Sequence, residues 1–258
     1  TQVRKKYAQP RKTEIIYSHE VEEYREEEQV EDYPVTVFLS REGYFKKITP
    51  QSLRMSGEQK FKEGDSLRQY FEAANSTELL LFTDKCQVYK TRASEFGETK
   101  ASALGDYLPA KLGMDAGENV IWLCLPGSVV FFFENGRAAR VALSAYATVS
   151  NRRKLTGAYC DKFPLVCAVH LTEDTELALE TNEPRALLVH TALLSPKTTR
   201  STQGVQVMNI KPKYRLEKVL PAAECGIVNG ARYRTRTIPA AGALLKPEDS
   251  EEKQLELL

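Results

Sequence analysis

Basic side chains recur in polar loops along this chain, and their chemistry is the binding of anions. Arg152, Arg153 and Lys154 are three consecutive cations in one such loop. Lysine and arginine laid along a track neutralise the closely spaced phosphates of a polyanion without reading its sequence. We predict that this track consists of Lys60, Lys62, Lys100, Arg152, Arg153, Lys154, Lys197, Arg200, Arg232, Arg234 and Arg236. The alternative for each of them is an ordinary solvated surface residue.

The last three of these cations alternate with uncharged residues. Arg232, Arg234 and Arg236 are separated by a tyrosine and a threonine, and this alternation predicts the basic face of a β-strand. The strand face is either part of the track or a charged sheet edge that discourages aggregation.

The charge of the chain is unevenly distributed, although its formal net value is only +1. Residues 35–240 contain 28 basic and 21 acidic side chains, whereas residues 1–34 contain 6 and 9 and residues 241–258 contain 2 and 5. A basic body therefore lies between two acidic flanks. Such an asymmetry matters more than the average charge for attracting a polyanion.

Residues that would support catalysis or metal binding lack the required spacing. The histidines, His19, His170 and His190, are far apart, and no two of the five cysteines form a Cys-x-x-Cys pair. No nucleophile elbow, phosphate-binding loop or dinucleotide fingerprint occurs. We therefore expect no catalytic site, no metal and no cofactor, and cysteines that fill a core in a reducing cytoplasm. Trp122, within an apolar run, is predicted to be a core residue rather than a base-stacking platform.

The loops belong to a repeated unit. An apolar strand, a short turn and a second strand recur at 35–48, 79–91, 129–141, 177–189 and, in a degenerate form, 225–236. Asn135-Gly136 and Asn229-Gly230 are strong signals for tight turns, and Gly43 occupies the same place as Gly136 in its unit. The units begin 44, 50, 48 and 48 residues apart, so the hairpin is the core of a repeat.

A hairpin in every 48 residues or so predicts four strands per repeat, stacked as the blades of an all-β propeller. A plain β-sandwich is the structural alternative, but it has no reason to repeat at this interval. Residues 66–75 have apolar side chains at helical spacing, yet the repeat requires a strand there, and we predict a strand.

Specific stretches of the chain resemble a known family. Residues 3–15 (Val-Arg-Lys-Lys-Tyr-Ala-Gln-Pro-Arg-Lys-Thr-Glu-Ile), the first hairpin at 35–48, the stretch 80–83 and Gln203-Gly204-Val205 appear in the order found in the C-terminal domain of type IIA DNA topoisomerase A subunits. These are the A subunits of DNA gyrase and topoisomerase IV. The resemblance covers roughly residues 1–236, and it is strongest over 1–92 and 196–210.

The resemblance implies a fold and a domain organisation. It implies a β-pinwheel, which is a propeller-like ring, here of about five four-stranded blades with a short N-terminal helical lead-in. The expected domains are the end of a coiled-coil arm at 1–17, an acidic linker at 18–34, the β-pinwheel at 35–240 and an acidic C-terminal tail at 241–258.

The resemblance also implies a function. The family domain binds double-stranded DNA without sequence specificity, bends or wraps it and presents the transport segment for strand passage. The cleavage tyrosine and the metal site belong to an upstream domain, so the parent would be an ATP-dependent bacterial topoisomerase, cytoplasmic and nucleoid-associated, with no membrane contact. Its partners would be DNA, the rest of its own A chain and the ATPase B subunit.

One departure from the family pattern affects the choice between its members. The gyrase protein carries a Gln-Arg-Arg-Gly-Gly-Lys-Gly box in its first blade, whereas residues 56–64 here read Ser-Gly-Glu-Gln-Lys-Phe-Lys-Glu-Gly. The loss of the Arg-Arg-Gly-Gly core argues against negative supercoiling and favours a topoisomerase IV-like or divergent A subunit, but the sequence does not decide between gyrase and topoisomerase IV activity. The alternative function is a propeller-type module that docks proteins and touches DNA little.

Overall fold

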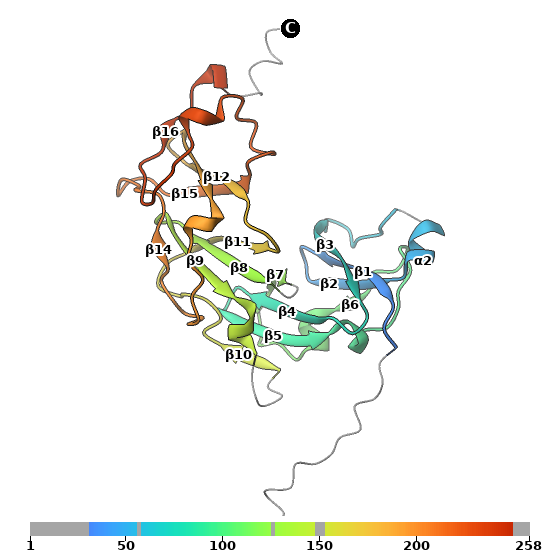
Figure 1. Cartoon of the computed structure of the whole chain (residues 1–258). Coiled ribbons are helices and arrows are strands. Elements are labelled where there is room, and N and C mark those ends of the chain that lie inside the picture. The colour runs from blue at the N-terminus through green and yellow to red at the C-terminus, as the bar shows by residue number, and fades with distance from the viewer. Residues whose placement is uncertain (1–30, 56–57, 125–126, 148–152, 250–258) are drawn as a thin grey trace, which may run out of the picture. The chain divides into compact units, whose positions relative to one another are not determined.

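Four antiparallel sheets of four strands each follow one another along the chain (Figure 1). This computed structural model describes residues 31–55, 58–124, 127–147 and 153–249. The helices within these residues are single turns or little more, so the all-β prediction is confirmed. The first 30 residues, which include the expected arm and most of the expected linker, and the end of the expected tail lie outside the described residues.

Each sheet has the same plan. The first sheet has the order β3 (Leu67–Ala74), β1 (Pro34–Ser40), β2 (Tyr44–Ile48), β6 (Asp106–Tyr107). The second has the order β7 (Val120–Cys124), β4 (Glu78–Thr83), β5 (Gln87–Arg92), β10 (Lys154–Thr156). The third has the order β11 (Leu165–Leu171), β8 (Ser128–Phe133), β9 (Arg137–Ala142), β14 (Val205–Gln206). The fourth has the order β15 (Leu216–Pro221), β12 (Glu176–Thr181), β13 (Arg185–His190), β16 (Ala243–Leu244).

The predicted hairpins form the centre of these sheets. The first four hairpins of the repeat are β1–β2, β4–β5, β8–β9 and β12–β13. Gly43 and Gly136 both have the left-handed backbone that the turn requires, with φ of 86° and 77°. Cys86 occupies the same place in the second hairpin and adopts φ of 54°.

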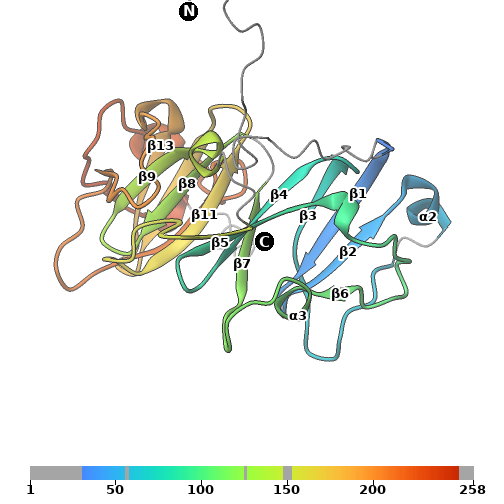
Figure 2. The same ribbon diagram turned by 90° about the horizontal axis from the view of Figure 1, so that it is seen from below.

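Strand exchange links consecutive sheets. The third strand of each sheet pairs with the first strand of the hairpin, as β3 pairs with β1. The fourth strand pairs with the second strand of the hairpin. In the first three sheets it is supplied only after the chain has made the next unit's hairpin, as β6 follows β4 and β5 (Figure 2). This exchange is the pinwheel arrangement, so the predicted fold is confirmed.

A short helix follows each hairpin. These helices are α2 (Pro50–Met55), η1 (Ala93–Glu95), η2 (Leu143–Tyr146) and η3 (Thr191–Leu193), where η denotes a 3-10 helix. A further turn, α3 (Leu108–Lys111), follows β6. Proline at the first or second position suits such turns, because the first N–H groups of a helix have no partner inside it. None of the helices in the described part of the chain has the length and apolar character needed to cross a bilayer.

The core consists of layers between successive sheets. In β8, Phe131 and Phe133 point to the layer shared with the second sheet, whereas Val130 and Phe132 point to the layer shared with the fourth. Alternate strand residues point to opposite faces of a sheet, so a strand buried on both faces is an uninterrupted apolar run. The run Val-Val-Phe-Phe-Phe at 129–133 is such a strand, and its residues are fully buried.

The strand predicted at 66–75 is confirmed as β3. Its apolar residues have helical spacing, but pairing with β1 along the whole strand outweighs that local preference. Tertiary pairing routinely overrides a weak local propensity of this kind.

The fifth hairpin predicted at 225–236 is wrong. This segment is irregular, with η4 (Gly230–Arg232), and it caps the outer face of the fourth sheet through the buried Tyr233. The described residues therefore form four blades rather than about five. The fourth sheet takes β16 from the segment expected as tail, just before η5 (Pro247–Asp249).

Candidate functional site

Loops that lead to the fourth strands carry most of the predicted cations. We call them exchange loops and define them as residues 97–105, 195–204 and 226–242, together with the loop before β10, which is described only from residue 153. Each runs beside the second strand of a hairpin. The bonds that show this are Thr99 N to Lys47 O at 2.7 Å, Lys90 N to Arg153 O at 2.7 Å, Lys197 N to Arg140 O at 2.8 Å and Leu188 N to Tyr233 O at 2.8 Å.

This shared backbone pairing places cations at equivalent points of four consecutive sheets. Lys100 follows the paired Thr99 in the first sheet, Arg153 and Lys197 are themselves the paired residues in the second and third, and Arg234 follows the paired Tyr233 in the fourth. The prediction that basic loops recur once per blade therefore has a structural counterpart in these residues. Lys154 continues from Arg153 into β10, opposite Tyr89.

The loop at 58–65 occupies the corresponding place in the first unit. No sheet precedes this unit within the described residues, so the loop does not supply a fourth strand and instead packs against its own sheet. Lys60 N donates to Ala101 O at 2.9 Å, which joins the loop to the exchange loop of the first sheet. The structure thus brings Lys60 and Lys100 to one sheet.

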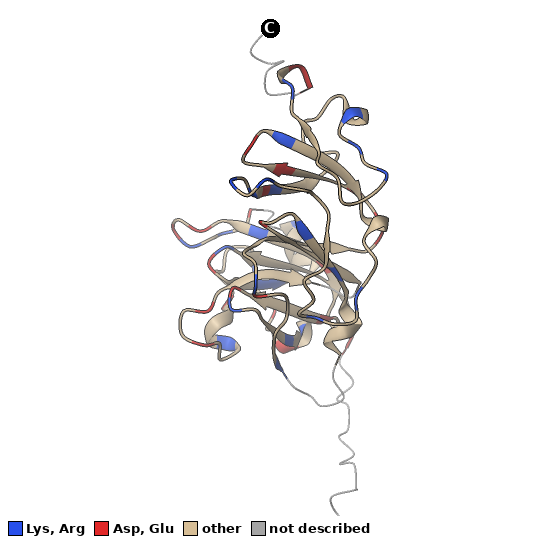
Figure 3. Ribbon diagram, turned by 90° about the vertical axis from the view of Figure 1, so that its left-hand side faces the viewer, with Lys and Arg blue, Asp and Glu red and all other residues tan. Residues whose placement is uncertain are grey.

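Four predicted cations are held by carboxylates. The pairs are Lys62–Glu42 at 2.8 Å, Arg153–Glu95 at 3.3 Å, Lys154–Asp115 at 2.8 Å and Arg234–Glu176 at 2.5 Å. Figure 3 shows basic and acidic positions close to one another on many loops. Carboxylates so placed compete with any anion for these cations.

The remaining described cations of the predicted set are Lys60, Lys100, Lys197, Arg200, Arg232 and Arg236. They have no ion-pair partner within the described part of the chain. Lys60, Lys100, Arg232 and Arg236 are exposed, whereas Arg200 lies over the ring of Tyr146 at 6.0 Å. Arg152 lies outside the described residues.

The basic strand face predicted at Arg232, Arg234 and Arg236 does not form. Arg232 ends the short helix η4, and Arg234 makes only an isolated bridge to Leu188. The alternation of charge was misleading because Tyr233 is buried against the fourth sheet by packing and by a 2.6 Å bond to Asp249, which turns the backbone away from an extended path. Two of the three arginines are nonetheless exposed and unpaired among the described residues.

Sequence reasoning missed the arginines that anchor the exchange loops. Arg137 donates to Gln203 O at 3.0 Å and Gly204 O at 2.8 Å, and Arg185 donates to Gly242 O at 2.9 Å. Both begin the second strand of their hairpins. An arginine directly after the turn of a repeated hairpin was the available signal.

Ion pairing in the site predicts a loss of stability in acid. Hydrogen bonds from Arg234 to Glu176, and from Lys154 and Gln87 to Asp115, hold the pKa of each carboxyl below its usual range. As the pH falls through 4.5, the unfolded chain therefore takes up protons before the folded one, and the free energy of unfolding decreases. We expect the melting temperature to drop between about pH 5 and pH 3, and to drop less in Glu176→Gln. Glu224→Gln, an exposed acid outside these pairs, is the control.

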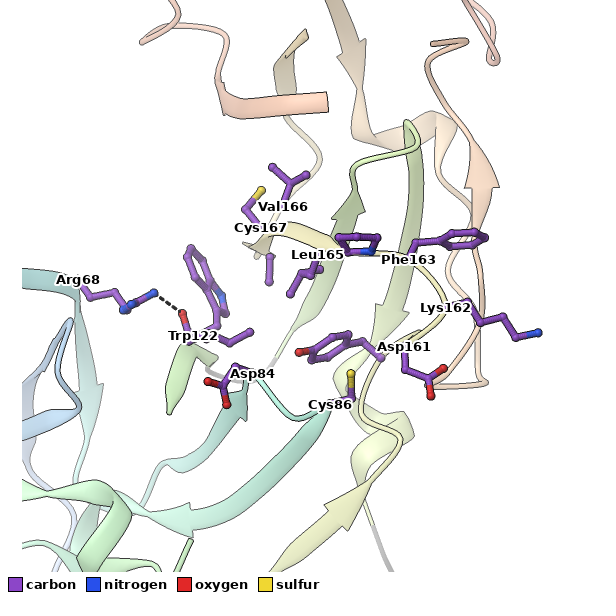
Figure 4. Close-up of a pocket in the computed structure, with 14 residues that line it drawn as sticks. Arg68, Asp84, Cys86, Trp122, Asp161, Lys162, Phe163, Leu165, Val166 and Cys167 are labelled. Carbon is purple, nitrogen blue, oxygen red and sulfur yellow. Dashed lines mark hydrogen bonds between the residues drawn. The ribbon is translucent and has the colours of Figure 1, made fainter. Parts of the chain in front are cut away.

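A pocket lies on the opposite edge of the sheets, near the third strands (Figure 4). It has a volume of about 670 Å³ and is lined by Arg68, Asp84, Cys86, Trp122 and residues 161–168, among others. Trp122 is partly buried and packs against the core between the second and third sheets. Burial raises the pKa of the Cys86 thiol, so this thiol is not an activated nucleophile.

The described histidines have structural contacts. The His170 ring packs edge-on against Phe71, and His190 Nδ1 accepts a bond from Ala192 N at 3.3 Å. Within the described ranges, no three His, Cys, Asp or Glu side chains gather as metal ligands.

Comparison with known proteins relates the chain to one family. The family model described as "DNA gyrase C-terminal domain, beta-propeller" matches residues 77–105 and 196–223. The DNA gyrase A protein of Aminobacterium colombiense is 27% identical over 222 residues, which cover 80% of this chain and 27% of that protein. This chain thus spans about a quarter of the length of that relative.

Solved structures share the fold. The C-terminal domain of DNA topoisomerase IV matches with a TM-score of 0.63 and 23% identity, covering 77% of this chain and 64% of that one. The E. coli ParC C-terminal domain matches with a TM-score of 0.58 and 16% identity, covering 83% of this chain and 94% of that one. The predicted resemblance is therefore confirmed.

Proposed function

Because this chain is related to the C-terminal domains of gyrase and topoisomerase IV A subunits, we propose that it binds duplex DNA without sequence specificity and bends or wraps it. The observation that carries the proposal is the recurrence of cations on the exchange loops. Lys100, Arg153 and Lys197 lie at matching points beside the second hairpin strand of three consecutive sheets. Cations at regular intervals along stacked blades can follow the phosphates of a bent duplex.

The physical terms of this function are electrostatic. Bending 20–30 base pairs costs on the order of 1–6 kcal/mol, and several phosphate contacts spread over the blades offset that cost. The parent protein would be the A component of a bacterial type IIA topoisomerase, acting in the cytoplasm on nucleoid DNA with an ATPase B subunit. In that enzyme this domain would present the transport segment for strand passage.

The direct test is binding of a duplex of about 40 base pairs to the chain at salt concentrations from about 50 to 300 mM. We expect a Kd of about 10⁻⁴–10⁻⁶ M near physiological salt and a steep fall of affinity with salt, because non-specific binding is almost wholly electrostatic. Relaxing closed circular DNA with a nicking-closing enzyme in the presence of the chain then reports any wrap as a change in linking number. Absence of binding at the lowest salt would overturn the proposal.

Removing the competing carboxylates should strengthen binding. Glu95→Gln and Glu176→Gln free Arg153 and Arg234 from their ion pairs. We expect the double variant to bind the duplex about 5- to 50-fold more tightly at about 0.1 M salt, since each freed cation adds up to one phosphate contact. The double variant Glu183→Gln with Glu224→Gln is the control with the same change of charge. Arg185, the partner of Glu183, stays engaged with the Gly242 carbonyl, and Glu224 is exposed and outside the ion pairs of the described residues. Equal gains in the variant and the control would contradict the competition.

A second function, protein docking, is favoured by one observation on the first sheet and its α2 helix. Met55 is 85% exposed and Tyr70 is 62% exposed, which is unusual for large apolar side chains. Protein docking is the better supported function if the chain does not bind DNA in a gel-shift assay at low salt and yet associates with a purified B subunit or with the rest of its own A chain.

A further inference from the structure

Two consecutive lysines in β2 are almost fully buried. Lys46 is 2% exposed and Lys47 is 3% exposed, although lysine side chains are almost never fully buried unless they are paired. Burying a charged ammonium without partners is strongly unfavourable, so each side chain must be compensated by close polar contacts.

Lys46 is compensated by loop carbonyls. Its Nζ donates to Lys60 O at 2.5 Å and to Ala101 O at 3.0 Å, and it contacts Gln59 Oε1 at 3.4 Å. The Phe61 ring lies 5.2 Å from the ammonium. Burial lowers the pKa of Lys46, and no carboxylate pairs with it within the described part of the chain.

The ammonium group of Lys46 and the backbones of Lys60 and Ala101 are joined by a closed set of hydrogen bonds. Lys60 N donates to the same Ala101 O that receives the Lys46 ammonium, and Lys60 O receives that ammonium as well. The loop at 58–65 and the exchange loop of the first sheet are therefore fastened to each other through Lys46. Lys60 and Lys100, exposed and next to the fastened carbonyls, project from this junction.

We infer that Lys46 is a positioning residue whose ammonium holds Lys60 and Lys100 together as one two-cation unit for adjacent backbone phosphates of duplex DNA. The inference rests on the proposed function and extends it to a buried group that does not itself touch DNA. Fixing two loops before binding avoids the entropy of ordering them on the ligand, which is the general benefit of preorganisation. This pair of lysines lies in the first sheet. The loop at 58–65 there does not lead to a fourth strand of a preceding sheet within the described residues, so its contacts with Lys46 hold it instead.

Lys47 provides a matched control on the same strand. Its Nζ donates to Asn75 Oδ1 at 2.8 Å, and the Tyr33 ring lies 5.9 Å away. Lys46→Met and Lys47→Met remove similar buried charges, but only the first releases the loop at 58–65. We expect comparable losses of melting temperature in the two variants and different effects on DNA.

The readout is the slope of log affinity against log salt for the same duplex. Lys46→Met should lower the slope by about 2 and the affinity by up to about 60-fold at about 0.1 M salt, because two phosphate contacts are lost. Lys47→Met should leave the slope within about 0.5 of the original. The Lys46→Met change is also made in a chain that already carries Lys60→Gln and Lys100→Gln. It should then change neither the slope nor the affinity further, because Lys46 acts on DNA binding only through these two lysines.

The results of these measurements distinguish failure of the positioning role of Lys46 from failure of the proposed DNA binding. If the unaltered chain binds DNA and Lys60→Gln with Lys100→Gln weakens it, an unchanged slope in Lys46→Met overturns the positioning role alone. If Lys46→Met does not fold, Phe61→Ala loosens the same junction from the loop side and should lower the slope by about 1. If Phe61→Ala folds and keeps the salt slope of the unaltered chain, the inference is refuted. If the unaltered chain itself does not bind DNA, the proposed function is refuted.

Discussion

Replacing Lys100, Arg153 and Lys197 together by glutamine is expected to lower the affinity for a duplex of about 40 base pairs by about 100- to 1,000-fold at about 0.1 M salt. Each phosphate contact contributes roughly a factor of ten at this salt, because log affinity varies with log salt by about 0.9 per neutralised phosphate. The slope should therefore fall by about 3. Lys100 and Arg153 are exposed, Lys197 is half-buried, and all three residues lie on exchange loops whose pairing to the sheets uses backbone atoms, so folding should be little affected.

The control for this triple variant carries the same change of charge elsewhere. Lys162, Lys213 and Lys218 are exposed and lie at or near the third strands, on the edge opposite the exchange loops. Their replacement by glutamine should weaken binding less than about threefold, since long-range attraction is largely screened at this salt. Equal losses in the two triple variants would show that DNA responds to net charge rather than to the exchange loops.

Gly204→Ala is expected to destabilise the fold by about 3 to 5 kcal/mol. Gly204 has φ of 64°, which alone costs an alanine about 1–2 kcal/mol. A methyl group there would also press into the carbonyl oxygen of Ala138 on β9, well inside van der Waals contact, and would push β14 off the third sheet. Urea denaturation followed by circular dichroism measures the free energy of unfolding.

Gly64→Ala separates the two causes. Gly64 has φ of 81°, but no atom lies within 4 Å of the added carbon. Its replacement should cost only the backbone contribution of about 1–2 kcal/mol. If both alanine variants lose the same stability, the close approach to Ala138 is not what demands glycine.

Much of the fold was predictable from the sequence because its central strands are locally encoded. The β8 run at 129–133 is apolar throughout, and Asn135-Gly136 supplies a turn whose conformation few other residues tolerate. Such hairpins fold from short-range information and reveal the period of the repeat. The strand at 66–75 was predictable only through that period, since its own spacing favours a helix.

The exchange was not predictable from the same signals. β6 and β14 contain two residues each, too few for any periodicity, and their partners lie in the preceding unit. The recurrence of basic loops indicated the candidate cations, but whether each is free depends on carboxylates distant in the sequence, as Asp115 is from Lys154. The burial of Lys46 likewise depends on loops that meet only in three dimensions.

The order in which the strands are supplied has a consequence for biosynthesis. β5 ends at Arg92, yet its free edge is covered only when Lys154–Thr156 has emerged from the ribosome. By then β9 has been synthesised, but its partner β14 has not. The nascent chain therefore carries at least one uncovered sheet edge from its first hairpin until Ala243–Leu244 has been synthesised. Uncovered edges are templates for pairing with neighbouring chains, so ribosomes translating one message in close succession would expose matching edges to each other.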